Sequence, residues 1–356
     1  MDLEGFARTH VAGRDLRAEP DFPHDIWRAM AEAGLFRIGL DPAHGGSGGG
    51  YAAIAKAETA LIAGGGSPGL GSAFASHQMV ARYFVEQFGD AAQRERWLRP
   101  LADGRITASI AISEPGAGAH PKHLRTTAER RDEAYVLTGE KAYLTNGPIA
   151  DLFIVLAITA VEDGRKRYSA FLVPHGTPGV ERVAMPDMPA LRPALHCGLR
   201  LTEADVPTSN LLGREGEAYE TMALPFRDTE DAVGSAGTVG SFRALLRRLA
   251  AIGTPDDAAA LGAMAALVAL MQEGSTALVA RLDATGEPPG PALVGIRVLT
   301  ADLLERARRF HDSHGGGGDP RVLAMFGSLE TSLNVARTAR LARQARLGEA
   351  LLQASP

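Results

Sequence analysis

The chain has 356 residues, of which 45% are hydrophobic and 22% are charged, and its formal net charge is −5. This composition is typical of a globular protein, and the length allows two or three packed units. The sequence shows no basic footprint of the kind that phosphate binding requires, so a nucleic-acid partner is not expected.

The amino-terminal residues and the cysteine content bear on the cellular compartment. The segment MDLEGFARTHVAGRD has no apolar core of the kind found in signal peptides. The longest apolar stretch, residues 258–271, is too short to span a bilayer and predicts a buried core helix. The only cysteine, Cys197, excludes an internal disulfide and fits a reducing compartment. We therefore expect a cytoplasmic protein with no membrane partner.

Residues 1–104 are rich in alanine and show helical periodicity. The pattern predicts helices over residues 2–13, 23–34, 51–63, 72–89 and 91–102. Glycine-rich stretches at 44–50 and 64–71 interrupt it. Neither stretch follows a strand, so neither is a dinucleotide-binding fingerprint. The first unit is predicted to be all-helical.

Residues 105–213 change to short β-prone runs separated by Gly, Pro, Asp and Asn. Strands are predicted at 106–113, 124–131, 134–139, 141–146, 151–159, 168–174, 179–183 and 195–207. Their near-regular spacing is typical of a compact β-sandwich or barrel.

Helical periodicity returns at about residue 214 and continues to the end of the chain. Four long helical segments are predicted, at 215–251, 256–285, 290–313 and 320–350. Because helical and β-prone runs are segregated along the chain, they argue for separate domains rather than for a parallel sheet built from alternating strands and helices. The predicted fold is therefore an α+β multidomain protein, with an N-terminal all-α domain (1–104), a middle β-sandwich or barrel domain (105–213) and a C-terminal four-helix bundle (214–356).

Two polar turns stand out in the middle unit. Residues 108–119 read ASIAISEPGAGA, and residues 139–147 read GEKAYLTNG. Each turn places a hydroxyl, Ser113 or Thr145, beside an apolar strand. Taken singly, each fits an ordinary β-turn. Taken together, they suggest a site for a flat ligand that needs an apolar ledge and a few fixed hydrogen-bonding groups.

Four segments resemble the acyl-CoA dehydrogenase family, in the same order and over residues 5–213. They are FPHDIWRAMAEAGLFRIGLDPAHGGSG (22–48), YFVEQFGDAAQRERWLRPLADGRITASIAISEPGAGA (83–119), AYVLTGEKAYLTNGPIADLFIVLA (134–157) and VPTSNLLG (206–213). The resemblance implies an FAD flavoprotein that forms a homodimer or homotetramer and oxidises an acyl thioester between Cα and Cβ. It also implies an acceptor such as electron-transfer flavoprotein.

The resemblance assigns the two turns to the flavin. Ile110, Ile112 and Ser113 would line its pyrimidine side, and Gly118 would let the backbone turn close to the ligand. Tyr143 and Thr145 would lie near the ring face and N5. An isoalloxazine ring is flat and mostly apolar with one polar edge, which such residues suit.

Two departures from the family pattern affect the predicted substrate residues. The first turn continues Ala119-His120 where the family has Ser-Asp, so a hydroxyl that contacts the acyl-pantetheine is missing. At the start of the bundle, Arg227 and Glu230 stand where the family has Asp and Arg. Glu230 would either repel a CoA phosphate or pair with Arg227 on one helix face. The family's Arg-x-x-Phe-Gly segment, which reaches a neighbouring subunit's FAD, is replaced by RRLAAIGTPDD (247–257).

The catalytic base is the largest departure. The base has to remove the α-proton on the face opposite the flavin. Glu330 is the candidate, but Glu-Thr-Ser replaces the family's Glu-Gly-Thr, and residues 326–347 read as one continuous helix. The alternative is a surface or bundle-capping carboxylate. His120 is a second titratable candidate. HDSH (311–314) has metal-like spacing without a third ligand, so no metal site is expected.

The sequence therefore predicts an oxidoreductase, an FAD-dependent acyl-CoA or acyl-carrier-protein dehydrogenase. Two alternatives remain open. A flavin-dependent monooxygenase on this scaffold needs no carboxylate base. A non-catalytic scaffold subunit is consistent with the missing Arg-x-x-Phe-Gly segment.

Overall fold

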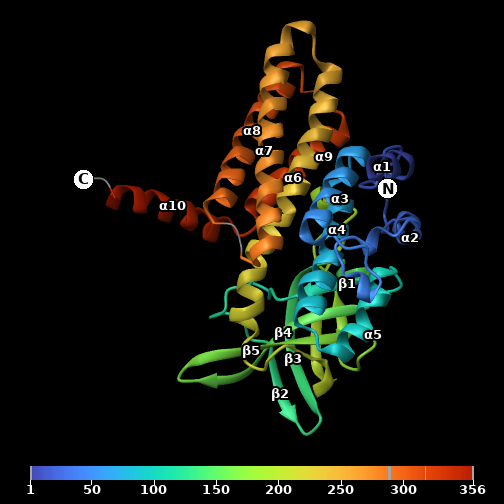
Figure 1. The fold of residues 1–356 in the computed structure, drawn as a ribbon, viewed down its shortest axis with the longest axis vertical. Helices are drawn as coiled ribbons and strands as arrows, with labels where there is room; N and C mark the ends of the chain where they lie inside the picture. The colour runs from blue at the N-terminus through green and yellow to red at the C-terminus, as the bar shows by residue number, and fades with distance from the viewer. Residues whose placement is uncertain (1, 288–289, 317, 355–356) are drawn as a thin grey trace.

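The structure is a computed structural model that describes residues 2–287, 290–316 and 318–354. Along the chain, a group of helices is followed by a sheet and then by a long helical bundle (Figure 1). This order of α, β and α elements confirms the predicted fold class.

The amino-terminal helices lie close to their predicted positions. They are α1 (Leu3–His10), α2 (His24–Glu32), α3 (Gly50–Gly65), α4 (Pro68–Met79) with a π-helical continuation Val80–Glu86, and α5 (Ala91–Ala102). Local signals explain their starts: the Ser67 side chain caps α4 ahead of Pro68, and Asp90 and Gln93 form a capping box on α5.

The middle unit is an eight-stranded sheet in the described chain. Its strands are β1 (Ala108–Ala111), β2 (Thr127–Arg131), β3 (Ala134–Thr145), β4 (Leu152–Glu162), β5 (Arg165–Pro174), β6 (Val180–Val183), β7 (His196–Pro207) and β8 (Leu211–Leu212). The order is β6-β7-β3-β2-β4-β5-β8, and β1 also pairs with β4. Side chains from six of these strands form one enclosed apolar cluster, as expected of a sandwich or barrel.

One correction concerns the predicted strands at 134–139 and 141–146. They are a single strand, β3, because Gly139 continues the strand through a bulge instead of ending it. Gly139 has φ +151°, and a Cβ there would lie 2.6 Å from Thr126 Oγ1. Only glycine therefore fits at this point of the strand.

The carboxy-terminal helices are α6 (Leu224–Ile252), α7 (Ala258–Thr285), α8 (Pro291–Ser313), α9 (Pro320–Asn334) and α10 (Arg337–Ala354). The first four share one apolar core, which is the predicted four-helix bundle. By length and composition alone, the segment Pro255–Thr285 is the one helix in the described ranges that could cross a membrane, with mean hydropathy 1.4. The prediction that residues 258–271 form a buried core helix is wrong for most of that stretch, because the face that includes Leu270 is exposed. Part of this helix packs in the bundle core through Met264, Val268 and Met271.

The predicted continuous helix over 326–347 is wrong. The chain breaks between α9 and α10 at Val335 and Ala336, and Ala336 adopts a left-handed φ of +50°. Beyond the break, α10 projects from the bundle (Figure 1). Its first turns are tied to α6 by ion pairs from Arg340 to Asp231 and from Arg343 to Asp228.

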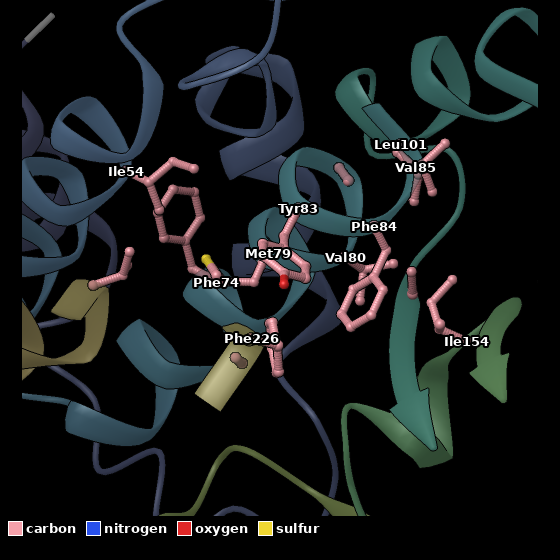
Figure 2. Close-up of a cluster of buried hydrophobic side chains, with 14 of the residues drawn as sticks. Ile54, Phe74, Met79, Val80, Tyr83, Phe84, Val85, Leu101, Ile154 and Phe226 are labelled. Carbon is pink, nitrogen blue, oxygen red and sulfur yellow. The ribbon is translucent and has the colours of Figure 1, made fainter. Parts of the chain in front are cut away.

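The three units share a common apolar core. Figure 2 shows Phe74 and Tyr83 from the helical unit next to Phe226 of α6, with Ile154 of β4 at the same cluster. The Tyr83 hydroxyl also donates to Met222 O at 2.8 Å, just before α6. This packing fixes α6 against both the sheet and the amino-terminal helices. It thereby sets the position of the α6 residues that face the sheet.

Candidate functional site

Two adjacent cavities lie between the sheet and the carboxy-terminal bundle. The larger, of about 630 Å³, runs along α6, α8 and the end of α9, and the smaller, of about 160 Å³, lies against β1 and the start of α6. Four residues border both cavities: Ser113, Tyr143, Thr145 and Glu230. Three of them are predicted flavin residues, so the structure brings the two turns together at the boundary between the cavities.

A buried ion pair holds the first turn. Lys141 Nζ lies 2.9 Å from Glu114 Oε1 and donates to Ile112 O at 3.3 Å. The Glu114 carboxylate also accepts from the backbone N–H groups of Arg125 and Thr126, at 2.6 and 2.9 Å. Burial lowers the pKa of Lys141 to about 8, while Glu114 acts in the opposite direction. This pair fixes Ser113 beside Ala142, whose N–H donates to Ser113 O at 2.9 Å.

The second turn is held by cross-strand contacts. Thr145 is the register partner of His196 on β7, and its hydroxyl lies 3.0 Å from His196 Nε2. The Ser109 hydroxyl donates to Thr145 O at 2.6 Å. Burial lowers the pKa of His196, so its ring is neutral at pH 7. His196 borders the larger cavity, a role that the sequence analysis missed and that the β3–β7 register would have indicated.

Tyr143 has an unusual backbone. Its φ is +63°, in the left-handed region, and it lies where the β3–β7 register shifts. Its N–H contacts Met185 Sδ at 3.2 Å, and its side chain is 56% exposed and borders both cavities. A non-glycine residue in this conformation is strained, and such strain concentrates at functional sites. The bulge directs an aromatic ring toward the place predicted for the flavin.

Glu230 lies on α6 at the junction of the two cavities. Glu230 is exposed by its accessible surface, although many neighbouring protein atoms lie around its carboxyl. Desolvation raises its pKa to about 7, the neighbouring Asp231 carboxylate raises it further, and Arg340 and Arg227 act in the opposite direction. The sequence analysis treated Glu230 only as a substrate-contacting residue.

The other predicted residues divide into two groups. Ile110, Ile112, Ala119 and Arg227 all line the smaller cavity. Arg227 makes no ion pair with Glu230 within the described part of the chain. Besides its charge effect on Glu230, Arg227 lowers the pKa of Tyr219 through its charge and a side-chain hydrogen bond, although burial raises that pKa overall.

Gly118 and His120 are exposed and line neither cavity. Gly118 has φ +56° and closes the turn by hydrogen bonds with Glu114. The His120 ring packs against His123, with their centroids 4.8 Å apart.

Glu330 does not reach either cavity. It lies on α9 and borders an adjoining cavity of about 460 Å³ between α8 and α10, and its carboxylate pairs with Arg308. The adjoining cavity shares five lining residues with the larger one: Asp231, Leu293, Arg297, Leu333 and Arg340. The helix break that might have turned a carboxylate inward comes several residues later, at Ala336.

The residues present fit the isoalloxazine part of FAD. The larger cavity lies within the size range of ligand sites. Ser113 and Thr145 supply hydroxyls, Ile110 and Ile112 supply an apolar surface, and Tyr143 supplies an aromatic ring. The segment 247–257 ends α6 and forms a capping box between Thr254 and Asp257. It therefore has a local structural role at the end of the bundle.

Comparisons with known proteins identify the family of the chain. Family models for the acyl-CoA dehydrogenase N-terminal domain and middle domain match residues 2–105 and 109–204. The chain belongs to the acyl-CoA dehydrogenase family.

Named relatives and solved structures extend this result. Isovaleryl-CoA dehydrogenase from rice is 31% identical over 239 residues, covering 67% of this chain and 57% of the rice protein. Butyryl-CoA dehydrogenase from Megasphaera elsdenii superposes with a TM-score of 0.80 at 22% identity, over 98% of this chain and 96% of that one. A structure described as an FAD-dependent dehydrogenase gives a TM-score of 0.80 at 24% identity, over 93% and 92%. The chain thus spans less than two thirds of the curated relatives it matches, and the solved structures share its fold.

Proposed function

We propose that this protein is an FAD-dependent acyl thioester dehydrogenase in which Glu230 is the catalytic base. One observation carries the proposal: Glu230 borders both cavities together with Ser113, Tyr143 and Thr145. A carboxylate and the predicted flavin residues therefore converge on one volume. The family relationship and the relatives named above support FAD as the cofactor.

FAD, when bound, would supply the hydride acceptor. Ser113 and Thr145 would hold its polar edge through their hydroxyls, and Tyr143 would cover a ring face. The neutral His196 would fix the orientation of the Thr145 hydroxyl. These residues would orient the cofactor beside Glu230.

Glu230 has the properties that the proton-transfer step requires. General bases work best when their pKa lies near the operating pH, and the pKa of Glu230 is raised to about 7. At neutral pH a large share of the side chain is therefore ionised and able to take the α-proton. This assignment supplies a base within the cavity, which removes the reason for favouring a monooxygenase.

Glu330 lacks these properties, because its carboxylate pairs with Arg308 outside both cavities. The sequence motif that pointed to Glu330 lies on α9, whereas the cavity is bordered by its successors Thr331 to Leu333. We therefore assign the base to α6 instead of α9.

The test is anaerobic reduction of the flavin by acyl thioesters. Purified protein should contain or bind FAD, and a substrate thioester should bleach its visible absorbance. Glu230→Gln should slow bleaching by about 10²–10⁴-fold while retaining FAD, and Glu330→Gln should behave like wild type. The reverse result would return the base to Glu330. A colourless protein that does not take up FAD would refute the proposal and favour the non-catalytic scaffold.

The partners and location follow as part of the same proposal. The acyl group would arrive on CoA or a carrier protein, with Arg227 as a cation for the carrier in the smaller cavity. Electrons would leave to an electron-transfer flavoprotein or another acceptor. We further propose a cytoplasmic homodimer or homotetramer.

A further inference from the structure

A fourth cavity continues from the larger one toward the amino-terminal helices. It has a volume of about 180 Å³ and shares Ser72, Gly234, Thr238 and two other lining residues with the larger cavity. Its wall contains five hydroxyl side chains: Ser72, Thr238, Ser241, Ser328 and Ser332. These hydroxyls and Glu58 add polar groups to a wall whose surface is otherwise mostly apolar.

One face of α6 connects this pocket to the proposed base. Glu230, Gly234, Gly237 and Ser241 are spaced three or four residues apart and so follow the same side of the helix. From Glu230 to Gly237 the helix rises about 10 Å. The two glycines leave a groove along this face, since neither has a side chain to fill it.

Glu58 of α3 lies at the end of this groove. Its side chain is 4% exposed, and Oε2 has no hydrogen-bond partner among the described residues. A Cβ at Gly237 would lie 2.5 Å from Glu58 Oε1, so the glycine is what allows the carboxyl to reach the groove. A buried polar atom without a partner costs about 1–3 kcal/mol, and a ligand group that pairs with it recovers that cost.

We propose that this pocket binds the end of the acyl chain and selects medium-length acyl thioesters whose far end carries an uncharged hydrogen-bonding group, such as a hydroxyl. This inference rests on the proposed function, because it assumes that the reacting carbons lie beside Glu230.

The pocket favours an uncharged group for two reasons. No lysine, arginine, histidine or second carboxylate lines it, so neither an anion nor a cation would find a fixed counter-charge apart from Glu58. Desolvation raises the pKa of Glu58 to about 8, so at neutral pH its carboxyl is mostly protonated. A protonated carboxyl both donates and accepts a hydrogen bond, which a terminal hydroxyl can satisfy. An alkyl end would leave Glu58 Oε2 without a partner.

The experiment measures binding separately from turnover. FAD-loaded Glu230→Gln protein is titrated by calorimetry with ω-hydroxyacyl-CoA thioesters and with alkyl thioesters of equal length, from hexanoyl to dodecanoyl. We expect the hydroxylated series to bind about ten-fold more tightly at the best length. Adding Glu58→Leu should abolish this preference. Glu95→Leu, the same change at an exposed position of α5, should leave it intact.

The outcomes separate this inference from the proposed function. Equal or weaker binding of the hydroxylated series, or a preference that survives Glu58→Leu, would overturn the inference. A preference that depends on Glu58 supports the pocket even if wild-type flavin is not bleached, a result that would refute only the dehydrogenase activity. Absence of binding by every thioester would overturn both.

Discussion

Replacing Glu58 with Gln should make the protein more stable at neutral pH, although the change removes a carboxyl from the interior. Gln keeps the shape of Glu58 and stays uncharged at every pH. The wild-type carboxyl ionises in the unfolded chain but resists ionisation in the folded protein, because burial raises its pKa. The substitution therefore removes a free-energy cost of folding that exists only at pH values at which the Glu58 carboxyl of the unfolded chain is ionised.

The magnitude follows from the two pKa values. The ordinary value is 4.5 and the folded value is about 8. Below pH 4.5 the carboxyl is protonated in both states and imposes no cost. As the pH rises toward 8, the folded state alone keeps the proton, and stability is lost at about 1.4 kcal/mol per pH unit. At pH 7 the cost is on the order of 3 kcal/mol.

The assay is urea denaturation of wild type and Glu58→Gln at a series of pH values from 4.5 to 8, with FAD at the same saturating concentration. The difference in unfolding free energy should grow from near zero at pH 4.5 to about 3 kcal/mol at pH 7 and about 4 kcal/mol at pH 8, in favour of the variant. Other titrating groups are common to both proteins and cancel in this difference. A difference that stays flat over this range would show that Glu58 is ionised in the folded protein and refute the reasoning.

Three further substitutions test the site and the assembly. Lys141→Met should leave Glu114 buried without its cation and lower the unfolding free energy by about 3–5 kcal/mol in thermal or urea denaturation. A second change, Glu114→Gln, should recover part of the loss, because it removes the charge and keeps an acceptor for the N–H groups of Arg125 and Thr126. Tyr143→Gly should relieve backbone strain of about 1–2 kcal/mol yet weaken FAD binding, measured by flavin fluorescence; unchanged affinity would show that the ring does not contact the cofactor. Leu270→Asp, at a residue 63% exposed on α7, should shift the proposed homo-oligomer toward smaller species in sedimentation velocity, and an unchanged distribution would exclude this face from the proposed interface.

The secondary structure was largely predictable because its signals are local. Helical periodicity and caps such as Ser67 and Asp90 fix the amino-terminal helices within a few residues. The two errors have a common origin in backbone conformations that the sequence marks poorly. Gly139 was read as a break although it continues a strand, and Ala336 ends a helix without a glycine or proline signal. Tertiary contacts, including the Arg340–Asp231 ion pair, hold that second turn in place.

The site was only partly predictable. The turns at Ser113 and Thr145 are contiguous motifs, so their convergence on one cavity could be expected from sequence. Glu230 and Glu58 could not be assigned in this way, because their roles depend on what α3, α6 and the sheet enclose between them. Glu330 was predicted as the base because Glu-Thr-Ser resembles the family's Glu-Gly-Thr motif, but the position of α9 places it at a different cavity.

Glu230 and Glu58 show how one groove can give two carboxyls different tasks. Desolvation is the first cause of the raised pKa at both positions. Around Glu230 the cations Arg340 and Arg227 oppose that effect and Asp231 adds to it, which leaves the pKa at about 7, where a base can exchange protons. No charged neighbour contributes at Glu58, so its carboxyl holds its proton at neutral pH and acts as a hydrogen-bonding group. The charged residues near Glu230, which are Asp231, Arg227 and Arg340, therefore set a pKa suited to the proposed proton transfer. Glu58 keeps the proton that the proposed recognition of a hydroxyl needs. Neutralising Arg340 should raise the pKa of Glu230 while leaving that of Glu58 in place.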